Sequence, residues 1–131
     1  MKKGYVTDIE HATRENGDFR RVLYTSNYMQ LVLMSIPAGG EIGEEVHGVD
    51  QFLRIESGEG TAILNGSEHA LTGSSVIVVP AGVRHNVLST GSEPLKLYSL
   101  YAAPHHADKT VHVTKEEADA DDEEFMGDTT E

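Results

Sequence analysis

The chain has 131 residues, no cysteine and a formal net charge of −12, which fits one domain and excludes disulfides, thiolate metal sites and cysteine nucleophiles. It offers no basic patch for a phosphate backbone, so nucleic acid is not an expected partner. No apolar run approaches the length of a membrane span and the N-terminal residues lack the apolar segment of a signal peptide, so we expect a cytoplasmic protein without a membrane partner.

From residue 19 onward, short apolar and β-branched runs alternate with turns rich in glycine, proline and asparagine. The run 28–36 is apolar on both faces, which predicts a central strand covered on both sides. Asn65-Gly66 is a preferred sequence for a two-residue hairpin turn. The predicted strands are 19–25, 28–36, 51–56, 61–64, 68–71, 75–79, 85–89 and 95–102.

Many short strands without a helical period predict an all-β sandwich or barrel. We expect an N-terminal extension over 1–18, the β-domain over 19–113, and a short helix with an acidic tail over 114–131. Thr114 and Glu117 have the spacing of a capping box, which predicts the start of that helix. Residues 115–131 hold nine acids and one lysine, so most of the net charge lies in a tail that we expect to be mobile.

Three side chains that can bind a metal, Glu45, His47 and Gln51, occupy odd-numbered positions. In an extended chain, residues of one parity share a face. Leu53 and Ile55 continue this parity, so the three polar side chains are predicted to point toward the apolar interior. Burying them is costly unless something satisfies them, and a divalent metal would do so.

A second segment, Pro80-Ala81-Gly82-Val83-Arg84-His85, places His85 directly after a tight turn. Two imidazoles, a carboxylate and a carboxamide form a mixed nitrogen and oxygen site suited to Fe(II), Mn(II), Ni(II), Co(II) or Zn(II). Within this set His47, His85 and Glu45 can supply a face of two histidines and one carboxylate. Open coordination positions on such a metal would orient and polarise a substrate oxygen.

The two segments resemble the two motifs of the cupin superfamily. The first reads Gly39-x5-Glu45-x-His47-x3-Gln51-x6-Gly58 and is similar to Gly-x5-His-x-His-x3-4-Glu-x6-Gly. The second reads Gly73-x6-Pro80-x-Gly82-x2-His85 and is similar to Gly-x5-Pro-x-Gly-x2-His-x3-Asn, with one more residue in its first gap. The resemblance is nearest to the small bacterial cupins of the mannose-6-phosphate-isomerase-like and RmlC-like kind. It implies a single jelly-roll barrel with one metal near its mouth.

The sequence departs from these motifs at three positions. Glu45 stands where the family usually has its first histidine, and Gln51 stands in place of the glutamate, so the carboxylate has in effect changed position. Ser89 occupies the place of the final asparagine. Four groups capable of metal binding are nevertheless retained. The resemblance leaves metal and reaction open, because cupins include isomerases, dioxygenases, decarboxylases, lyases, sensors and storage proteins.

Each candidate ligand also has a plainer interpretation. Glu45 can be an exposed loop acid beside Glu44, and Gln51 can donate a hydrogen bond near the metal without binding it. His105 and His106 follow Pro104 and can fold over the barrel mouth, but the preferred interpretation is a solvated loop. The histidines outside the two motifs are His11, His69, His105, His106 and His112.

The leading function hypothesis is a metal-dependent enzyme acting on a small polar substrate such as a sugar, a hydroxy acid or a keto acid. In this hypothesis Glu45, His47, Gln51 and His85 hold the metal, and Glu45 also serves as the catalytic base because no separate base stands out. The alternatives are a non-catalytic sensor or carrier and a structural cupin with an empty site. Phe52 lies on the face opposite the ligands, which favours a homodimer.

Overall fold

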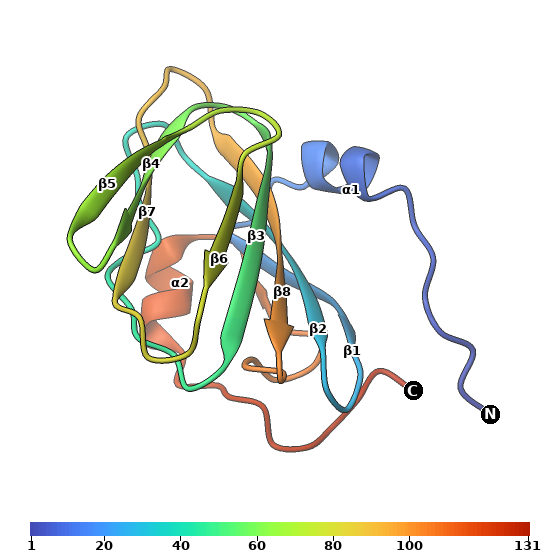
Figure 1. The fold of residues 1–131 in the computed structure, drawn as a ribbon. Helices are drawn as coiled ribbons and strands as arrows, with labels where there is room; N and C mark the ends of the chain where they lie inside the picture. The colour runs from blue at the N-terminus through green and yellow to red at the C-terminus, as the bar shows by residue number, and fades with distance from the viewer.

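The computed structural model describes residues 1–131 and contains two antiparallel β-sheets that face each other, with two short helices at the periphery (Figure 1). This arrangement confirms the predicted all-β jelly-roll architecture. In chain order the elements are α1 (Ile9–Glu15), β1 (Arg20–Thr25), β2 (Gln30–Ile36), β3 (Asp50–Ser57), β4 (Gly60–Leu64), β5 (Ser67–Leu71), β6 (Val76–Val79), β7 (His85–Ser89), β8 (Leu95–Ala102), β9 (Val111–His112) and α2 (Lys115–Ala120).

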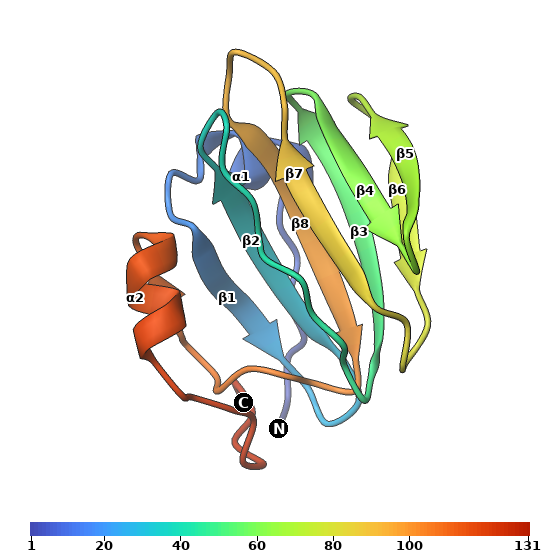
Figure 2. The same cartoon turned by 90° about the vertical axis from the view of Figure 1, so that its left-hand side faces the viewer.

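The larger sheet has six strands in the order β6-β3-β8-β2-β1-β9, and the smaller has three in the order β5-β4-β7. Figure 2 shows β7 and β4 of the smaller sheet in front of β8 and β3 of the larger one. Inward-facing side chains of both sheets fill the space between them. The alternation along β3 and β8 follows the predicted parity, since Leu53, Ile55, Leu95 and Leu97 are at most 1% exposed.

β2 is covered on both faces, as its apolar sequence predicts. It lies between β1 and β8, and Val32, Leu33, Met34 and Ile36 are all buried. The hairpin between β4 and β5 also forms as predicted. Asn65 and its neighbour Gly66 both adopt positive φ, which is the conformation that a type I′ turn requires.

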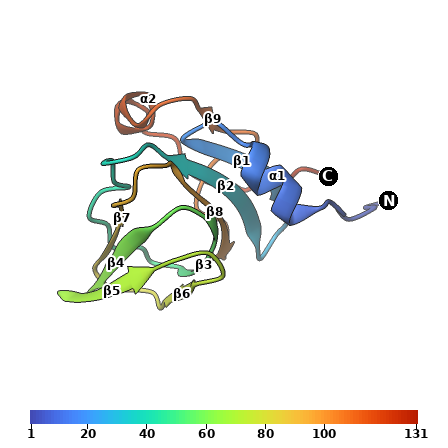
Figure 3. The ribbon, with the colours of Figure 1, turned by 90° about the horizontal axis from the view of Figure 1, so that it is seen from above.

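The two helices lie on different sides of the barrel. α1 was not predicted; it packs on the outer face of the larger sheet, against β8, β3 and β2 (Figure 3). α2 lies beside β9, at the edge of the same sheet. It begins as predicted, because the Thr114 side chain accepts a hydrogen bond from the Glu117 amide. Neither helix has the length and apolar character needed to cross a membrane.

Parts of the acidic tail contact the barrel through specific hydrogen bonds, and the mobility of the tail stays a prediction. The Glu123 carboxylate accepts hydrogen bonds from His106 and from the Ala107 amide. Further along, the Thr130 amide donates to the Thr25 carbonyl at 2.9 Å, at the end of β1. Acidic composition alone predicts mobility, but here specific donors on the barrel bind the carboxylates.

The outer face of β3 and β6 remains partly open to solvent. Val76 and Val78 are 50% and 60% exposed, and their strand partners Arg54 and Phe52 are half-buried. Phe52 thus lies on the face where the sequence favours a second subunit. The homodimer stays a prediction.

Candidate metal centre

The two segments that carry the predicted ligands lie side by side. Glu45 and His85 form an isolated antiparallel bridge, in which the Glu45 amide donates to the His85 carbonyl at 2.8 Å and the His85 amide donates to the Glu45 carbonyl at 2.9 Å. The Gly82 amide donates to the His47 carbonyl at 2.8 Å. The strand β3 begins only at Asp50, so Glu45 and His47 belong to the preceding loop rather than to one continuous strand with Gln51.

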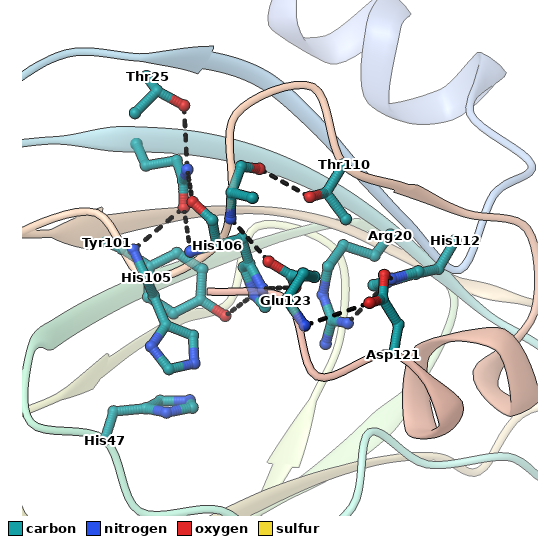
Figure 4. A network of polar contacts seen from close by, with 12 residues as sticks. Arg20, Thr25, His47, Tyr101, His105, His106, Thr110, His112, Asp121 and Glu123 are labelled. Carbon is teal, nitrogen blue, oxygen red and sulfur yellow. Dashed lines mark hydrogen bonds and ion pairs between the residues drawn. The ribbon is translucent and has the colours of Figure 1, made fainter. Parts of the chain in front are cut away.

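His47 lies at the centre of a group of aromatic side chains. Its ring centroid is 4.3 Å from that of His105, 5.0 Å from that of His85 and 5.7 Å from that of Tyr101. Figure 4 shows the His105 ring next to the His47 ring, and the two ring planes are tilted by 56°. The Nε2 atom of His47 is 3.3 Å from Oε2 of Glu45. Metal-binding atoms of Glu45, His47 and His105 all lie within 4.8 Å of one another, so this cluster could hold a metal ion.

Gln51 and His85 approach the same region from inside the barrel. The Gln51 amide donates to Oγ of Ser99 at 2.9 Å, which leaves its carbonyl oxygen free. The Nδ1 atom of His85 lies 2.9 Å from the Val83 carbonyl, so Nδ1–H donates there and Nε2 is free. Glu45, Gln51, His85 and Tyr101 line an internal space of about 10 Å³. A space of this size suits one water molecule or one ion.

The buried polar atoms of this region fit a bound cation. His47 Nε2 and Gln51 Oε1 are both buried and form no hydrogen bond of good geometry, although His47 Nε2 lies 3.3 Å from Glu45 Oε2. Each such atom costs about 1–3 kcal/mol when left unsatisfied. Burial, together with the nearby His105 and His85, lowers the pKa of His47 to about 3, so its contact with Glu45 joins a neutral imidazole to a carboxyl group. A neutral imidazole is the form that binds a metal.

Glu45 is only partly exposed, and burial raises the pKa of its carboxyl group. The carboxylate is therefore less well stabilised by solvent than an exposed acid, while Arg20 and His85 partly offset this effect. A divalent cation would stabilise the ionised form. Glu45 lines both the internal space and the cavity at the barrel mouth, so its side chain borders both spaces.

A chain of hydrogen bonds runs from the centre to the C-terminal tail (Figure 4). The Tyr101 hydroxyl lies 3.3 Å from His106 Nε2, and His106 Nδ1 lies 2.7 Å from Glu123 Oε1. Burial lowers the pKa of His106 to about 4, so at neutral pH the ring is uncharged. Its Nδ1–H then donates to Glu123, and its Nε2 accepts from the Tyr101 hydroxyl. Burial also raises the pKa of Tyr101, which keeps this hydroxyl protonated.

Glu123 is expected to stabilise the fold in a pH-dependent manner. Burial opposes its ionisation, but hydrogen bonds from His106 and Ala107 outweigh this and lower its pKa to about 2. A depressed carboxyl pKa contributes stability above the unfolded-state pKa, and this contribution is lost as pH falls from about 4.5 through about 2. We expect Glu123→Gln to lower the free energy of unfolding of the metal-free protein by about 1–2 kcal/mol at neutral pH, after allowance for partial exposure.

Urea unfolding of the two proteins at a series of pH values would measure this effect. The difference between them should shrink toward zero as pH approaches 2. The control is Glu124→Gln, at the exposed neighbouring position, for which we expect less than about 0.5 kcal/mol at any pH. A constant difference across the whole range would show that Glu123 acts through packing rather than through its charge.

The structure corrects one interpretation of the sequence at this site. His105 and His106 do not form a solvated loop: His106 is 5% exposed, His105 is half-buried, and both rings pack against Tyr101. Sequence reasoning therefore missed His105 as a candidate ligand. The only signal was the position of the pair just after the last long strand, where the chain can turn over the barrel mouth.

A cavity of about 400 Å³ opens beside these histidines. Its wall combines residues of the barrel mouth with residues of α2 and the tail. The charged and polar members of this wall include Arg20, Glu45, His105, His106, Lys115 and Glu123. A space of this size and polarity suits a small polar molecule rather than a polymer.

The sequence and the fold were compared with those of known proteins. A family model described as "Cupin domain" matches residues 32–101. The chain is 48% identical over 123 residues to the Bacillus subtilis protein YrkC, covering 88% of this chain and 66% of YrkC. The crystal structure of BH2720 from Bacillus halodurans matches with a TM-score of 0.89 and 43% identity, over 91% of this chain and 96% of BH2720. An RmlC-like cupin from Shewanella frigidimarina matches in fold alone, with a TM-score of 0.59 and 20% identity over 63% of this chain and 73% of that one.

Proposed function

This chain belongs to the cupin family, and from that premise we propose that it binds one divalent transition metal and acts as a metal-dependent enzyme on a small polar substrate. The observation that carries the proposal is the pair of buried atoms without partners, His47 Nε2 and Gln51 Oε1. Both belong to side chains at motif positions, and the Glu45 carboxylate lies 3.3 Å from the first of them. Each such buried atom is costly unless a partner such as a cation satisfies it.

We assign Glu45, His47, Gln51 and His85 as the metal-binding residues. His47 and Glu45 are common to this set and to the cluster that includes His105. His105 adds a fifth possible donor. The mixture of imidazole nitrogen and oxygen donors suits Fe, Mn, Ni, Co or Zn. When bound, such a metal would supply Lewis acidity toward a substrate oxygen.

The chain's own residues would position the substrate and move its protons. The cavity beside Glu45 and His105 is lined mainly by polar groups, which favours a sugar, a hydroxy acid or a keto acid. Glu45 borders this cavity, and its carboxyl pKa is raised by burial toward the range of a useful general base. We therefore propose Glu45 as the group that accepts a substrate proton. Isomerase, lyase and dioxygenase reactions all fit these features.

The experiment is a turnover assay of metal-loaded protein with aldoses, ketoses, 2-hydroxy acids and 2-oxo acids, followed by NMR of the small molecules. We expect one of these classes to be converted by the wild type and not by His47→Ala. Glu45→Gln should lose turnover even in samples shown to retain metal. An unchanged rate in that variant would remove Glu45 from the role of base.

The alternative is a non-catalytic cupin that binds a small molecule as a sensor or carrier. Ligand-dependent shifts of the melting temperature without conversion of any compound would favour it over the enzyme. The same samples serve both measurements, so the two functions are compared under one set of conditions.

A further inference from the structure

A buried arginine lies beside the candidate metal centre without a carboxylate partner. Arg20 is the first residue of β1 and is only 7% exposed. Its side chain shares the inward face of the strand with Val22 and lines the mouth cavity. Figure 4 shows it between the Glu123 and His112 side chains. A buried guanidinium without an ion pair is costly, so its retention calls for an explanation.

The one hydrogen bond of the Arg20 guanidinium goes to a neutral acceptor. Its Nη1 atom lies 3.1 Å from Nδ1 of His112, and Nε2 of His112 lies 2.9 Å from Oδ2 of Asp121. Because Nε2–H donates to Asp121, Nδ1 carries the lone pair that accepts from Arg20. The Nε atom of Arg20 is buried and has no partner at all. The guanidinium therefore keeps most of its donors unused.

Three acids around this cavity are engaged by other groups, whereas Glu45 interacts with the Arg20 charge only at longer range. Glu123 accepts hydrogen bonds from His106 and Ala107, and Asp121 accepts from His112. Asp119 forms an ion pair with Lys115 at 2.7 Å. No carboxylate oxygen of the chain lies within ion-pair distance of Arg20, so its positive charge is not neutralised by a direct contact.

Arg20 and the candidate ligands border one space. Arg20, Glu45 and His105 all line the cavity of about 400 Å³. The positive charge of Arg20 also contributes to the lowered pKa of His47 and His105, as expected for groups that are close together. A molecule in this cavity can therefore contact the guanidinium at one end and the metal-binding cluster at the other.

We propose that Arg20 binds the carboxylate of a small anionic substrate, a 2-hydroxy or 2-oxo acid, whose remaining oxygen faces the Glu45, His47 and His105 cluster. The planar guanidinium matches a carboxylate in shape and charge, and its unused donors supply the hydrogen bonds. A neutral sugar would offer no charge to the Arg20 guanidinium, which has no carboxylate in direct contact. This inference rests on the proposed function. It narrows the substrate class from sugars, hydroxy acids and keto acids to the hydroxy acids and keto acids.

The test is an NMR titration of the protein with glycolate and with its neutral counterpart ethylene glycol, in metal-free and Mn²⁺-loaded samples. We expect glycolate to bind and ethylene glycol to bind at least about tenfold more weakly, because only glycolate carries the charge. Arg20→Gln should weaken glycolate binding about tenfold to hundredfold in both samples. Arg84→Gln removes an equal charge from an exposed position outside the cavity, so it should leave the affinity for glycolate unchanged.

Two outcomes would overturn the inference: equal glycolate affinity in Arg20→Gln and wild type, or equal binding of glycolate and ethylene glycol. If Arg20→Gln does not fold, Arg20→Lys retains the charge without the planar fork and should still weaken binding. A protein that binds glycolate through Arg20 but takes up no metal would contradict the metal enzyme and leave the anion site standing. A protein that binds metal, but whose affinity for glycolate does not depend on Arg20, would contradict the anion site and leave the metal enzyme standing.

Discussion

Replacing His47 with alanine is expected to weaken metal binding about 100-fold or more. Loss of groups that merely orient a metal ligand already costs about 10–100-fold, and His47 is assigned as a ligand itself. His47 is neutral and buried, and its Nε2 atom has no hydrogen-bond partner, so the substitution removes a donor that is ready to bind a metal. Competition with a chelator of known affinity would measure the dissociation constant.

Thermal unfolding gives an independent measure of the same effect. At a metal concentration 100 times the dissociation constant, the wild type should gain about 2.7 kcal/mol of stability, and His47→Ala should gain almost none. His69→Ala is the control, since His69 is exposed on β5 and distant from the centre. Equal affinity in wild type and His47→Ala would contradict the assignment of this site.

The same measurement of metal affinity shows whether His85 or His105 binds the metal together with Glu45 and His47. His85→Ala should weaken binding strongly if the motif positions hold the metal, since His85 lines the internal space beside Glu45 and Gln51. His105→Ala should have the larger effect if the cluster nearer the mouth holds it. Comparable losses in both variants would indicate that His85 and His105 both bind the ion.

Replacing Gly58 with alanine is expected to destabilise the fold by about 2–5 kcal/mol. Gly58 is the last glycine of the first motif and adopts a φ of +92°, which costs an L-residue about 1–2 kcal/mol. A Cβ atom there would lie only 2.5 Å from the Pro94 carbonyl oxygen and 2.9 Å from the Leu95 Cα atom. Forcing backbone apart in a packed region adds about 1–3 kcal/mol. Urea unfolding at neutral pH would measure the loss.

Gly66 provides a matched control for this substitution. It has a similar φ of +85°, but nothing lies within 4 Å of a Cβ atom added there. Gly66→Ala should therefore cost only the conformational part, about 1–2 kcal/mol. Equal losses at the two positions would show that the approach of the Pro94 backbone is unimportant, and that the motif glycine is required only for its φ.

The sheet strands could be predicted because their signals are local. Glycine and proline mark the turns, and alternation within each run shows which side chains face inward. This is why Gln51, Leu53 and Ile55 are buried on one face of β3 as expected, and why Asn65-Gly66 forms the hairpin turn. Strand parity grouped Glu45 with His47, but the proximity of His85 came from the motif resemblance, since His85 is distant from them in sequence.

The features that sequence reasoning missed depend on contacts between distant residues. α1 has only seven residues, and it is held by hydrogen bonds from Arg14 to the Glu56 carbonyl and from Lys96 to the Arg14 carbonyl. β9 has two residues and pairs only with β1. No periodicity within such short segments shows where they dock.

Contacts between distant residues also explain why the sequence did not predict the position of His105 or the contacts of the tail. The position of His105 beside His47 depends on how the chain turns after β8, which no local pattern specifies. The acidic composition of the tail predicted a mobile segment, whereas individual acids such as Glu123 bind donors presented by the barrel. The sequence gives no sign that Arg20 differs from other strand residues. Only the fold shows that its side chain faces inward and has no carboxylate as an ion-pair partner.

Elemental analysis of tag-free protein purified without chelators, beside the His47→Ala/His85→Ala double variant, would decide whether this cupin is a metalloprotein. We predict about one transition metal ion per chain in the wild type and none in the folded double variant. Iron would direct the search toward oxygen chemistry, and manganese, nickel or zinc toward isomerase and lyase reactions. A wild-type protein without metal, even after reloading with each of these ions, would contradict the proposed function.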